Sequence, residues 1–508
     1  MKYHCVVILF CLLTKGWAQF NPQPNEVTEK FFPDAFELEE VTPGLQKSKG
    51  FTTYNELMDF LNGLKIKFPE LVRIEYIGTS KKGKDIPIIY INNARQSGKK
   101  IRVFLQGGLH GDEPASTESV LYLLYDFLHN DENAELREHI ELAVIPMANI
   151  DGYVRLRRNN AENLDLNRDQ TKLMAHESVA LKKAFTDFNP HVALDFHEFR
   201  PFRRDFIKMG NFGVTGAFDL MFLYSGNLNV PQALRKHTNT NFLEPTRKIL
   251  DSLELSHFDY VTSAKHFGEI QFNRGSHNAR SSATNYALLN TVAALIEVRG
   301  VGIGRTSFKR RVFSGYIVGK SFLQQAVIHK ESTFSVLEET EANNEITVLL
   351  KRDVYQGELE VIDLETNEKI SLNVTYRDAL RSSPQLIRPR PKAYYISCDE
   401  RDLVVKLRTL GLMVDTIKID EEVEIERYLV TNRTTEGQKY EKMTLQSVQV
   451  ELETTKLSIP AGSFIVYTNQ ENANILTEVM EPEAPNSFVS FGLIKTRVNQ
   501  YLPIYRLP

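Results

Sequence analysis

Apolar residues along the chain follow two patterns. Short apolar runs bounded by glycine, proline or polar residues alternate with longer segments in which apolar residues return every three or four positions. The runs predict buried strands and the longer segments predict helices. Strands are expected at 72–77, 86–91, 101–105, 142–146, 191–196 and 293–298, and helices at 53–68, 114–128 and 178–188. Because these strands lack strict alternation, we predict an α/β fold with a mixed, mostly parallel sheet covered by helices on both faces.

Past residue 330 the pattern changes to short strands separated by polar turns. Arg388-Pro389-Arg390-Pro391 predicts a rigid linker between them. Strands are expected at 345–350, 357–362, 369–374, 393–396, 448–454 and 463–468, and a helix at 402–410. The chain is therefore divided into an extended N-terminal arm at 19–49, an α/β domain at 50–325 and a β-rich C-terminal extension at 330–508. The extension, of one or two small modules, shows no residues that suggest chemistry.

The first 18 residues have the order of a signal peptide. A lysine precedes an apolar core, and small residues stand at the positions before a cleavage site after Ala18. No later segment reaches the roughly 20 apolar residues of a membrane span, so the mature protein is expected to be soluble and either secreted or periplasmic. Cys5 and Cys11 leave with the signal, and Cys398 then has no partner for an intrachain disulfide. This cysteine usage fits a bacterial periplasm or medium better than an animal secretory protein.

Composition excludes few classes of function. The chain has 508 residues, 42% of them hydrophobic and 25% charged, which is ordinary for a globular protein of two or three domains. The net charge of −4, without a basic patch or repeat, gives no support to nucleic-acid binding.

The turn after the strand at 101–105 carries the first candidate chemistry. Gly107 and Gly108 end the strand, and Pro114 stands where a helix begins. Between them, His110 and Glu113 offer one nitrogen and one oxygen ligand in an H-x-x-E spacing, and zinc is the natural metal for such a pair. The spacing is common by chance and a loop histidine is usually solvated. A metal site is therefore predicted only if a third ligand can be found.

His197 is the expected third ligand, because it follows the strand ending at Phe196. His139, His176 and His191 are the competitors, and none of them follows directly on a strand end. The alternative for His197 is a buried histidine bonded to a neighbour. Two histidines and one glutamate leave the fourth zinc position for water, as in catalytic sites.

Two further stretches supply charged groups. In the polar stretch 157–169, guanidinium groups can polarise a carbonyl or bind a carboxylate, although a solvated loop is the default reading of such a stretch. Glu297 ends the strand at 293–296, where a rigidly placed carboxylate can act as a general base. Elsewhere such a glutamate is more often a cap or a salt-bridge partner.

Four motifs in this order resemble the zinc carboxypeptidase family of metallopeptidases. They are His110-x-x-Glu113, the run Asp165-Leu166-Asn167-Arg168, the strand-end His197, and Ile296-Glu297-Val298-Arg299. The resemblance covers roughly residues 53–319, and the C-terminal extension resembles one found on some bacterial members.

The resemblance implies a role for each matching residue. His110, Glu113 and His197 would hold one Zn²⁺ ion. Asn167 and Arg168 would bind the free C-terminal carboxylate of a peptide substrate. Arg158 would polarise the scissile carbonyl, with Arg157 as a near alternative that spacing does not exclude. Glu297 would act as general base and then as proton donor to the leaving amine.

The sequence also departs from the family pattern. Asp169 follows Arg168 where digestive members carry asparagine. Tyr286 is the first choice for the substrate-capping tyrosine and Tyr260 the second, and either aromatic could instead belong to the core. Arg280 could contact an acidic or carboxylate part of the substrate or form a salt bridge.

These residues together predict a secreted zinc metallocarboxypeptidase that uses zinc-activated water. One alternative is a zinc amidohydrolase of the same fold that acts on cell-wall peptides or N-acyl amino acids. A less favoured one is an inactive relative that binds peptide or glycan. The preferred C-terminal residue does not follow from the sequence.

Overall fold

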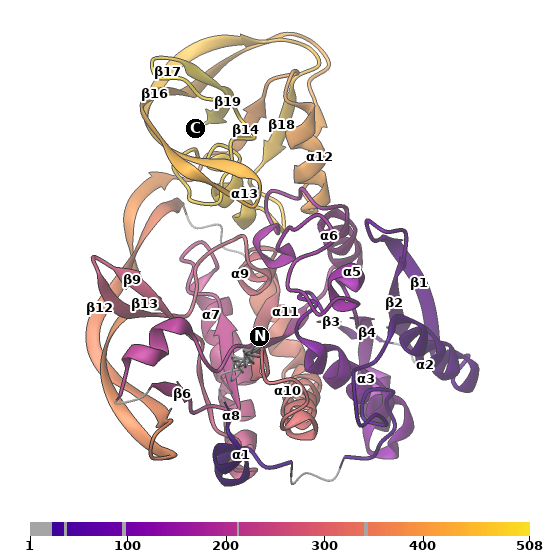
Figure 1. The fold of residues 1–508 in the computed structure, drawn as a ribbon. Coiled ribbons are helices and arrows are strands. Elements are labelled where there is room, and N and C mark those ends of the chain that lie inside the picture. The colour runs from indigo at the N-terminus through magenta and orange to yellow at the C-terminus, as the bar shows by residue number, and fades with distance from the viewer. Residues whose placement is uncertain (1–22, 35–37, 94–97, 211–212, 340–343) are drawn as a thin grey trace, which may run out of the picture.

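The computed structural model describes residues 23–34, 38–93, 98–210, 213–339 and 344–508 (Figure 1). The proposed signal peptide and its cleavage site lie outside these residues. An α/β part forms the lower body of Figure 1, and a smaller β-rich part stands above it. Among the described residues, no helix combines the length and apolarity needed to span a bilayer.

The α/β part is built on an eight-stranded sheet with the order β1-β2-β4-β3-β5-β11-β7-β8. The pairs β3–β4, β3–β5, β5–β11 and β7–β8 are parallel, and the other three are antiparallel. The predicted mixed, mostly parallel sheet is therefore confirmed. Its strands are β1 (Val72–Thr79), β2 (Asp85–Ile91), β3 (Ile101–Gln106), β4 (Ile140–Ile145), β5 (Val192–Phe199), β7 (Leu220–Tyr224), β8 (His257–Asp259) and β11 (Val292–Arg299).

Helices cover both faces of this sheet. The helical elements of the α/β part are α1 (Asn25–Phe31), α2 (Tyr54–Lys67), α3 (Pro114–His129), η1 (Asp131–Asn133), α4 (Ala134–His139), α5 (Ile150–Tyr153), η2 (Leu166–Arg168), α6 (His176–Phe188), η3 (Arg204–Lys208), α7 (Gln232–Thr238), η4 (Asn239–Leu243), α8 (Glu244–Ser252), α9 (Ser282–Leu288), α10 (Phe308–Ile328) and α11 (Lys330–Glu338). The helices predicted at 53–68, 114–128 and 178–188 correspond to α2, α3 and α6.

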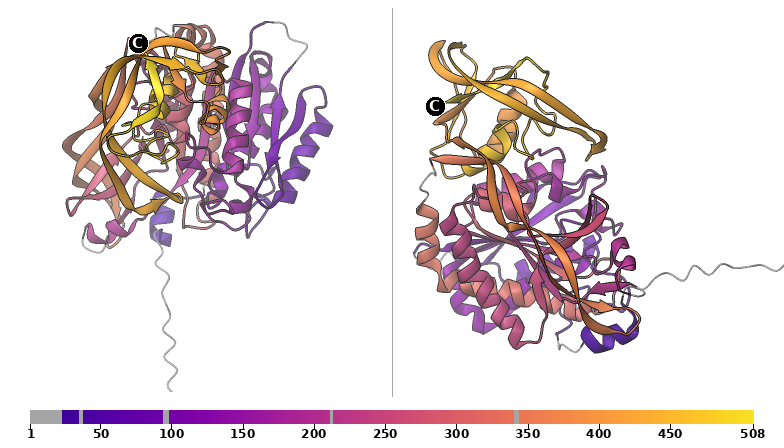
Figure 2. Two further views of the ribbon diagram at one scale, coloured as in Figure 1. Left: turned by 90° about the horizontal axis from the view of Figure 1, so that it is seen from above. Right: turned by 90° about the vertical axis from the view of Figure 1, so that its left-hand side faces the viewer.

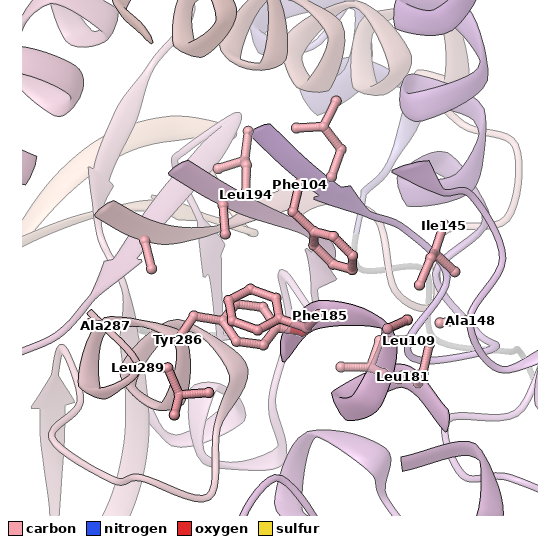
Figure 3. Close-up of a cluster of buried hydrophobic side chains, with 14 of the residues drawn as sticks. Phe104, Leu109, Ile145, Ala148, Leu181, Phe185, Leu194, Tyr286, Ala287 and Leu289 are labelled. Atoms are coloured by element: carbon pink, nitrogen blue, oxygen red, sulfur yellow. The ribbon is translucent and has the colours of Figure 1, made fainter. Parts of the chain in front are cut away.

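Close packing fixes the two helical layers. On one face α10 lies against α3, and a Cβ at Gly315 would come within 2.3 Å of the Ser119 hydroxyl. On the other face Phe185 of α6 and Tyr286 of α9 stack with ring centroids 4.0 Å apart, next to Phe104 of β3 (Figure 3). These buried aromatic contacts hold the strand ends, and hence the site described below, in a rigid frame.

The turn between β3 and α3 has the predicted form. Gly108 adopts a φ of +65°, a conformation that glycine reaches without strain, and a Cβ there would lie 2.7 Å from the Thr117 hydroxyl. Pro114 is the first residue of α3, where its missing N–H costs nothing. His110 and Glu113 are therefore held in a tight loop between two buried elements.

A second sheet joins the α/β part to the C-terminal extension. Its order is β6-β12-β13-β10-β9, and its strands are β6 (Val214–Gly216), β9 (Val261–His266), β10 (Glu269–Arg274), β12 (Glu345–Asp363) and β13 (Glu368–Pro389). The long hairpin of β12 and β13 runs along the flank of the α/β part (Figure 2). It pairs with β6 on one side and with β10 on the other, so the sheet crosses residue 330.

The strands predicted between 345 and 374 are too short. The runs at 345–350 and 357–362 are parts of the single strand β12, and the run at 369–374 lies within the longer β13. The pairing of β12 with β13 shifts register between Thr347 and Leu349 and between Lys351 and Asp353. Such bulges interrupt the alternation of side chains, which is why the sequence pattern breaks where the strand continues.

The remainder of the extension forms a six-stranded sheet with two helices. The strand order is β15-β18-β14-β19-β16-β17. The elements are β14 (Ala393–Ile396), α12 (Arg401–Thr409), β15 (Asp415–Thr416), β16 (Glu421–Tyr440), β17 (Met443–Ile459), β18 (Phe464–Tyr467), α13 (Asn474–Met480) and β19 (Tyr501–Leu507). The strands and helix expected at 393–396, 463–468 and 402–410 are confirmed as β14, β18 and α12, and the run at 448–454 lies within β17.

The N-terminal arm is not extended throughout, contrary to the prediction. Residues Asn25–Phe31 form α1, and Val27 and Phe32 bury their side chains against Ala217 and Ile362. This apolar contact with both β6 and β12 regions explains why a segment with few local helix signals is ordered.

Glu478 of α13 is buried where the extension meets the α/β part. Its Oε1 accepts hydrogen bonds from the side-chain amides of Asn227, at 2.6 Å, and Asn229, at 3.0 Å. Burial raises the pKa of Glu478 from its ordinary value of 4.5 to about 7, and the two amide hydrogen bonds offset this only in part. The folded protein therefore favours the protonated carboxyl.

This shift predicts a pH-dependent effect of Glu478→Gln. Because the pKa is raised on folding, ionisation of Glu478 has no effect on stability well below pH 4.5. It destabilises the fold increasingly between pH 4.5 and about 7, and by a constant amount at higher pH. Glutamine keeps the Oε1 acceptor and cannot ionise. The free energy of unfolding should rise by up to about 3 kcal/mol at pH 8 and by less than about 1 kcal/mol at pH 5, measured by urea denaturation.

Glu481→Gln is the matched control, because Glu481 is also buried in the extension but pairs with Arg388 at 2.7 Å. Loss of that ion pair should lower stability at both pH values. An equal effect of Glu478→Gln at pH 5 and pH 8 would contradict the assignment.

Candidate metal centre and substrate pocket

Three buried side chains converge near the carboxyl ends of β3 and β5. The His110 Nδ1 lies 2.7 Å from Glu113 Oε1, and the His197 Nδ1 lies 2.8 Å from Glu113 Oε2 and 3.0 Å from His110 Nδ1. The three ligand atoms lie within 4.8 Å of one another. The sequence-predicted metal ligands are thus brought together, although His197 lies 84 residues from Glu113 and 87 residues from His110 in the chain.

Two aspartates orient the histidine rings. The His110 Nε2 lies 3.1 Å from Asp165 Oδ1, and the His197 Nε2 lies 3.0 Å from Asp195 Oδ2. Each ring can therefore donate its Nε2–H to a carboxylate and turn Nδ1 toward the centre. Metal-binding histidines are commonly held in this way, which fixes the tautomer and raises the basicity of the ligand nitrogen.

The donor set fits a zinc ion. Burial works against protonation of His197, yet the carboxylates of Asp195 and Glu113 hold the pKa of its ring well above the ordinary value. Burial likewise opposes ionisation of Glu113, and the two histidines nevertheless lower the pKa of this carboxyl. The centre therefore favours positive charge between the three ligands, and two imidazole nitrogens with one carboxylate are the ligand types of catalytic zinc.

Glu297 lies beside His197 on the neighbouring strand. In the parallel pairing of β5 and β11, Glu297 is in register with His197, and the two side chains share one face of the sheet. Glu297 also lines the pocket next to the metal centre. Burial, followed by the negative charge of Glu113, raises the pKa of Glu297 to about 7.

The prediction for His197 needs one correction. β5 does not end at Phe196 but continues to Phe199, so His197 lies within the strand. The strand is extended by its pairing with β11, in which residues 197 to 199 match residues 297 to 299. The strand period of two then places Asp195 and His197 on the same face, a signal that the sequence contained.

Arg158 and Arg157 differ clearly in position. Arg158 Nε donates to Asp165 Oδ2 at 2.9 Å, its Nη1 lies 3.6 Å from Glu113 Oε1, and it lines the pocket. Arg157 is exposed and does not line the pocket. The geometry therefore brings Arg158, and not Arg157, to the metal centre.

Asn167 and Arg168 line the pocket from η2. The Asn167 Oδ1 accepts a hydrogen bond from the Ser282 N–H at 2.8 Å, and Arg168 Nη1 donates to the Asn167 carbonyl at 2.8 Å. Asp169, the departure from the family pattern, accepts hydrogen bonds from the N–H groups of Met174 and Ala175. Asp169 therefore closes a turn and takes no part in the pocket lining.

The structure does not bring Tyr286 to the pocket. Its side chain is 2% exposed and packs against Phe185 and Phe104, so burial takes it out of reach of a substrate (Figure 3). All residues of the short helix α9 are buried, which the sequence pattern alone did not indicate. Tyr260, between β8 and β9, does line the pocket, and burial followed by the charge of Glu297 raises its pKa.

The pocket has a volume of about 950 Å³ and is shared between the two parts of the chain. Strand β12 contributes Arg352, Leu359, Glu360 and Val361. The tip of the β16–β17 hairpin also reaches the rim, where Glu441 Oε2 accepts a hydrogen bond from the Asp165 N–H at 2.7 Å. The extension, in which the sequence showed no chemistry, therefore touches the loop that orients His110.

The competing histidines lie elsewhere. His191 Nδ1 accepts from the Arg102 N–H at 2.9 Å, His176 is exposed at the start of α6, and His139 ends α4. None of these three is in the group formed by His110, Glu113 and His197.

Comparison with known proteins agrees with the geometry. A family model described as zinc carboxypeptidase matches residues 57–198. Carboxypeptidase 2 of Trichophyton rubrum is 30% identical over 445 residues, which are 84% of this chain and 81% of that protein. The chain belongs to the zinc carboxypeptidase family. It is a metallocarboxypeptidase, a hydrolase, and the family is zinc-dependent.

The likeness of this metallocarboxypeptidase to its relatives extends beyond the metal centre. Carboxypeptidase 2 of Trichophyton equinum is 30% identical over 440 residues, again 84% of this chain and 81% of the relative. A match of this length cannot be confined to the first 330 residues, so it includes much of the C-terminal extension. Among solved structures, the carboxypeptidase A from Helicoverpa armigera matches with a TM-score of 0.43 and 18% identity, over 56% of this chain and 78% of that one.

Proposed function

We propose that this metallocarboxypeptidase removes the C-terminal residue of peptides by activating a water molecule, with Glu297 as the general base. The register of β5 and β11 supports the proposal, because it sets Glu297 beside the proposed metal ligand His197, and Glu297 lines the same pocket as Arg158. His110, Glu113 and His197 would hold one Zn²⁺ ion.

Glu297 would accept and donate the protons that are transferred in the reaction. Zinc, when bound, supplies Lewis acidity that makes a water molecule more acidic and a carbonyl more electrophilic. A carboxyl with a pKa of about 7 can accept a proton from the attacking water and return it to the leaving amine near neutral pH. An ordinary carboxyl would be the weaker base.

The arginines would act on the two oxygen-bearing groups of the substrate. Arg158 is held by Asp165 with its guanidinium facing the metal centre, where it would stabilise the negative charge that develops on the carbonyl oxygen. Arg168 would bind the terminal carboxylate, and the Asn167 side chain, held by Ser282, would support it. Tyr260 lines the same pocket and, in place of Tyr286, would contact the substrate.

Arg168→Gln should raise KM far more than it lowers kcat for a peptide with a free C-terminus. The guanidinium forms no ion pair among the described residues, so its charge is available to the substrate carboxylate. We expect KM to rise by about 10- to 100-fold, as for loss of a charge-assisted hydrogen bond. Steady-state kinetics on a free-acid peptide measure this effect.

The C-terminal amide of the same peptide is the control substrate. The wild type should favour the acid strongly, and the variant should lose most of that preference. Equal loss of activity toward acid and amide would show that Arg168 does not recognise the terminal carboxylate.

The activity itself is tested by following C-terminal release from a defined peptide mixture, with muropeptides and N-acyl amino acids assayed alongside. Sequential loss of C-terminal residues, abolished by chelation and restored by zinc, supports the proposal. Turnover of muropeptides or N-acyl amino acids alone would favour the amidohydrolase alternative, and zinc binding without any hydrolysis would favour the inactive relative.

We further propose that the protein is exported. The order of charged, apolar and small residues in positions 1–18 supports this proposal. Amino-terminal sequencing of the mature protein from culture medium or periplasm tests it, and a chain that begins at Gln19 is the expected result.

A further inference from the structure

Besides the exposed Arg200, Arg203 and Arg204, three partly buried arginines line the pocket without a carboxylate partner. They are Arg168, Arg280 and Arg352, and none of them forms an ion pair within the described part of the chain. Arg168 donates to the Asn167 carbonyl, and Arg352 donates to Asn273 Oδ1 at 3.2 Å. Arg280 lies over the ring of Tyr440, 4.9 Å from its centroid. A pocket with three unpaired guanidinium groups is suited to an anion.

The acidic residues of the pocket are occupied elsewhere. Asp165 contacts His110 and Arg158, Glu198 pairs with Arg311, and Glu360 pairs with Lys369. Asp205 accepts a hydrogen bond from Ser263 at 3.0 Å. Of the two remaining carboxylates, Glu297 is the proposed base, and Asp112 is adjacent to the metal ligand Glu113. None of these carboxylates forms an ion pair with Arg280 or Arg352.

The charges around these arginines also favour a bound anion. Burial lowers the pKa of Arg280. Tyr440, Asp165 and Glu441 act in the opposite direction, and the nearby charge of Arg168 lowers the pKa as well. Burial also lowers the pKa of Arg352. The charges of Arg377 and Arg280 lower it as well, and Asp378 acts in the opposite direction. Each guanidinium is partly desolvated and repelled by its neighbour, a cost that a bound carboxylate would relieve.

The C-terminal extension holds Arg280 in place. Tyr440 packs against its guanidinium, and the next residue, Glu441, is hydrogen-bonded to the Asp165 backbone. The two turn residues of this hairpin, Glu441 and Lys442, have φ angles of 47° and 65°, which residues other than glycine adopt at a cost. The strained tip is kept in contact with the rim, so Tyr440 is a positioning residue for Arg280.

We infer that the pocket selects peptides whose C-terminal residue is glutamate or aspartate. Arg168 binds the terminal carboxylate, and Arg280 with Arg352 binds the side-chain carboxylate of the same residue. This inference rests on the proposed function. A C-terminal leucine would leave Arg280 and Arg352 desolvated without a counter-charge, and a C-terminal lysine would add a repelling charge.

The test is a series of N-acetyl-Ala-Ala-X peptides in which X is glutamate, aspartate, glutamine, leucine or lysine. We expect kcat/KM for the glutamate peptide to exceed that for the glutamine peptide by about 10- to 100-fold, because glutamine matches its shape without the charge. In Arg280→Gln the ratio should fall toward one, and Tyr440→Leu should lower it to an intermediate value.

A matched control separates loss of selection from general damage. Arg427 also stacks on a tyrosine of the extension, Tyr501, at 3.6 Å, but it does not line the pocket. Arg427→Gln should keep the wild-type ratio of glutamate to glutamine peptide. Arg352→Gln provides a second pocket variant if Arg280→Gln does not fold, and it should lower the ratio in the same direction.

Product binding makes the inference independent of turnover. Calorimetry with N-acetylglutamate and N-acetylglutamine should show the acid binding about 10-fold or more tightly to the wild type. Equal binding of the two, or equal hydrolysis of glutamate and glutamine peptides, overturns the inference while leaving the peptidase proposal intact. Absence of hydrolysis of any peptide, with selective binding of N-acetylglutamate, overturns the proposed function and leaves the inference standing.

Discussion

Glu297→Gln is expected to lower kcat for peptide hydrolysis by about 10²- to 10⁴-fold, the usual contribution of general acid–base catalysis. Glutamine occupies nearly the same volume and cannot accept a proton from water. Glu297 is not among the three converging ligands, so the zinc content of the variant should equal that of the wild type. Single-turnover kinetics combined with metal analysis check both expectations.

Glu331→Gln serves as the control for this prediction. Glu331 is exposed in α11, and the same change of a carboxylate to an amide there should leave kcat unchanged. Retention of more than about a tenth of wild-type kcat in Glu297→Gln would contradict the role of Glu297 as the base.

His197→Ala is expected to lower zinc affinity by more than the roughly 10- to 100-fold typical of losing an outer partner of a metal ligand. It removes one of the three protein ligands and leaves Glu113 and Asp195 buried without the ring that contacts them both. Zinc affinity is measured by competition with a chromogenic chelator. Activity at a limiting zinc concentration should be lost in parallel.

Thermal unfolding gives an independent view of the same site. Zinc in large excess over its dissociation constant should raise the melting temperature of the wild type, because a ligand that binds only the folded state stabilises it. The same zinc should have little effect on His197→Ala. His176→Ala, which changes an exposed histidine away from the centre, should bind zinc as the wild type does. Zinc-dependent stabilisation of His197→Ala equal to that of the wild type would show that His197 is not a ligand.

The sequence was most informative where local pattern and chemistry coincide. The apolar run of β3, the Gly107-Gly108 turn and Pro114 each restrict the backbone on their own, and together they placed His110 and Glu113 correctly between a strand and a helix. The parallel order of the central strands followed from alternating strand and helix signals. Both features depend on residues that are near one another in the chain or on neighbouring strands.

Long-range packing accounts for most of what the sequence did not predict. No local signal distinguishes Tyr286, which is buried by α6, from Tyr260, which faces the pocket. The contact between Arg280 and Tyr440 joins two residues far apart in the chain through a hairpin whose reach depends on the packing of the whole extension. The pairing of Asp195 with His197 is the exception, because the alternation of side chains along β5 was available to predict it.

The sheet that crosses residue 330 has a consequence for how this enzyme can be divided. β6 and β10 pair directly with β12 and β13, and Glu478 of α13 is hydrogen-bonded to the loop after β7. A fragment truncated before β12 would expose two unpaired strand edges, which promote aggregation. The metal-binding part is therefore not an independently folding module, and expression trials should keep the polypeptide intact through Pro508.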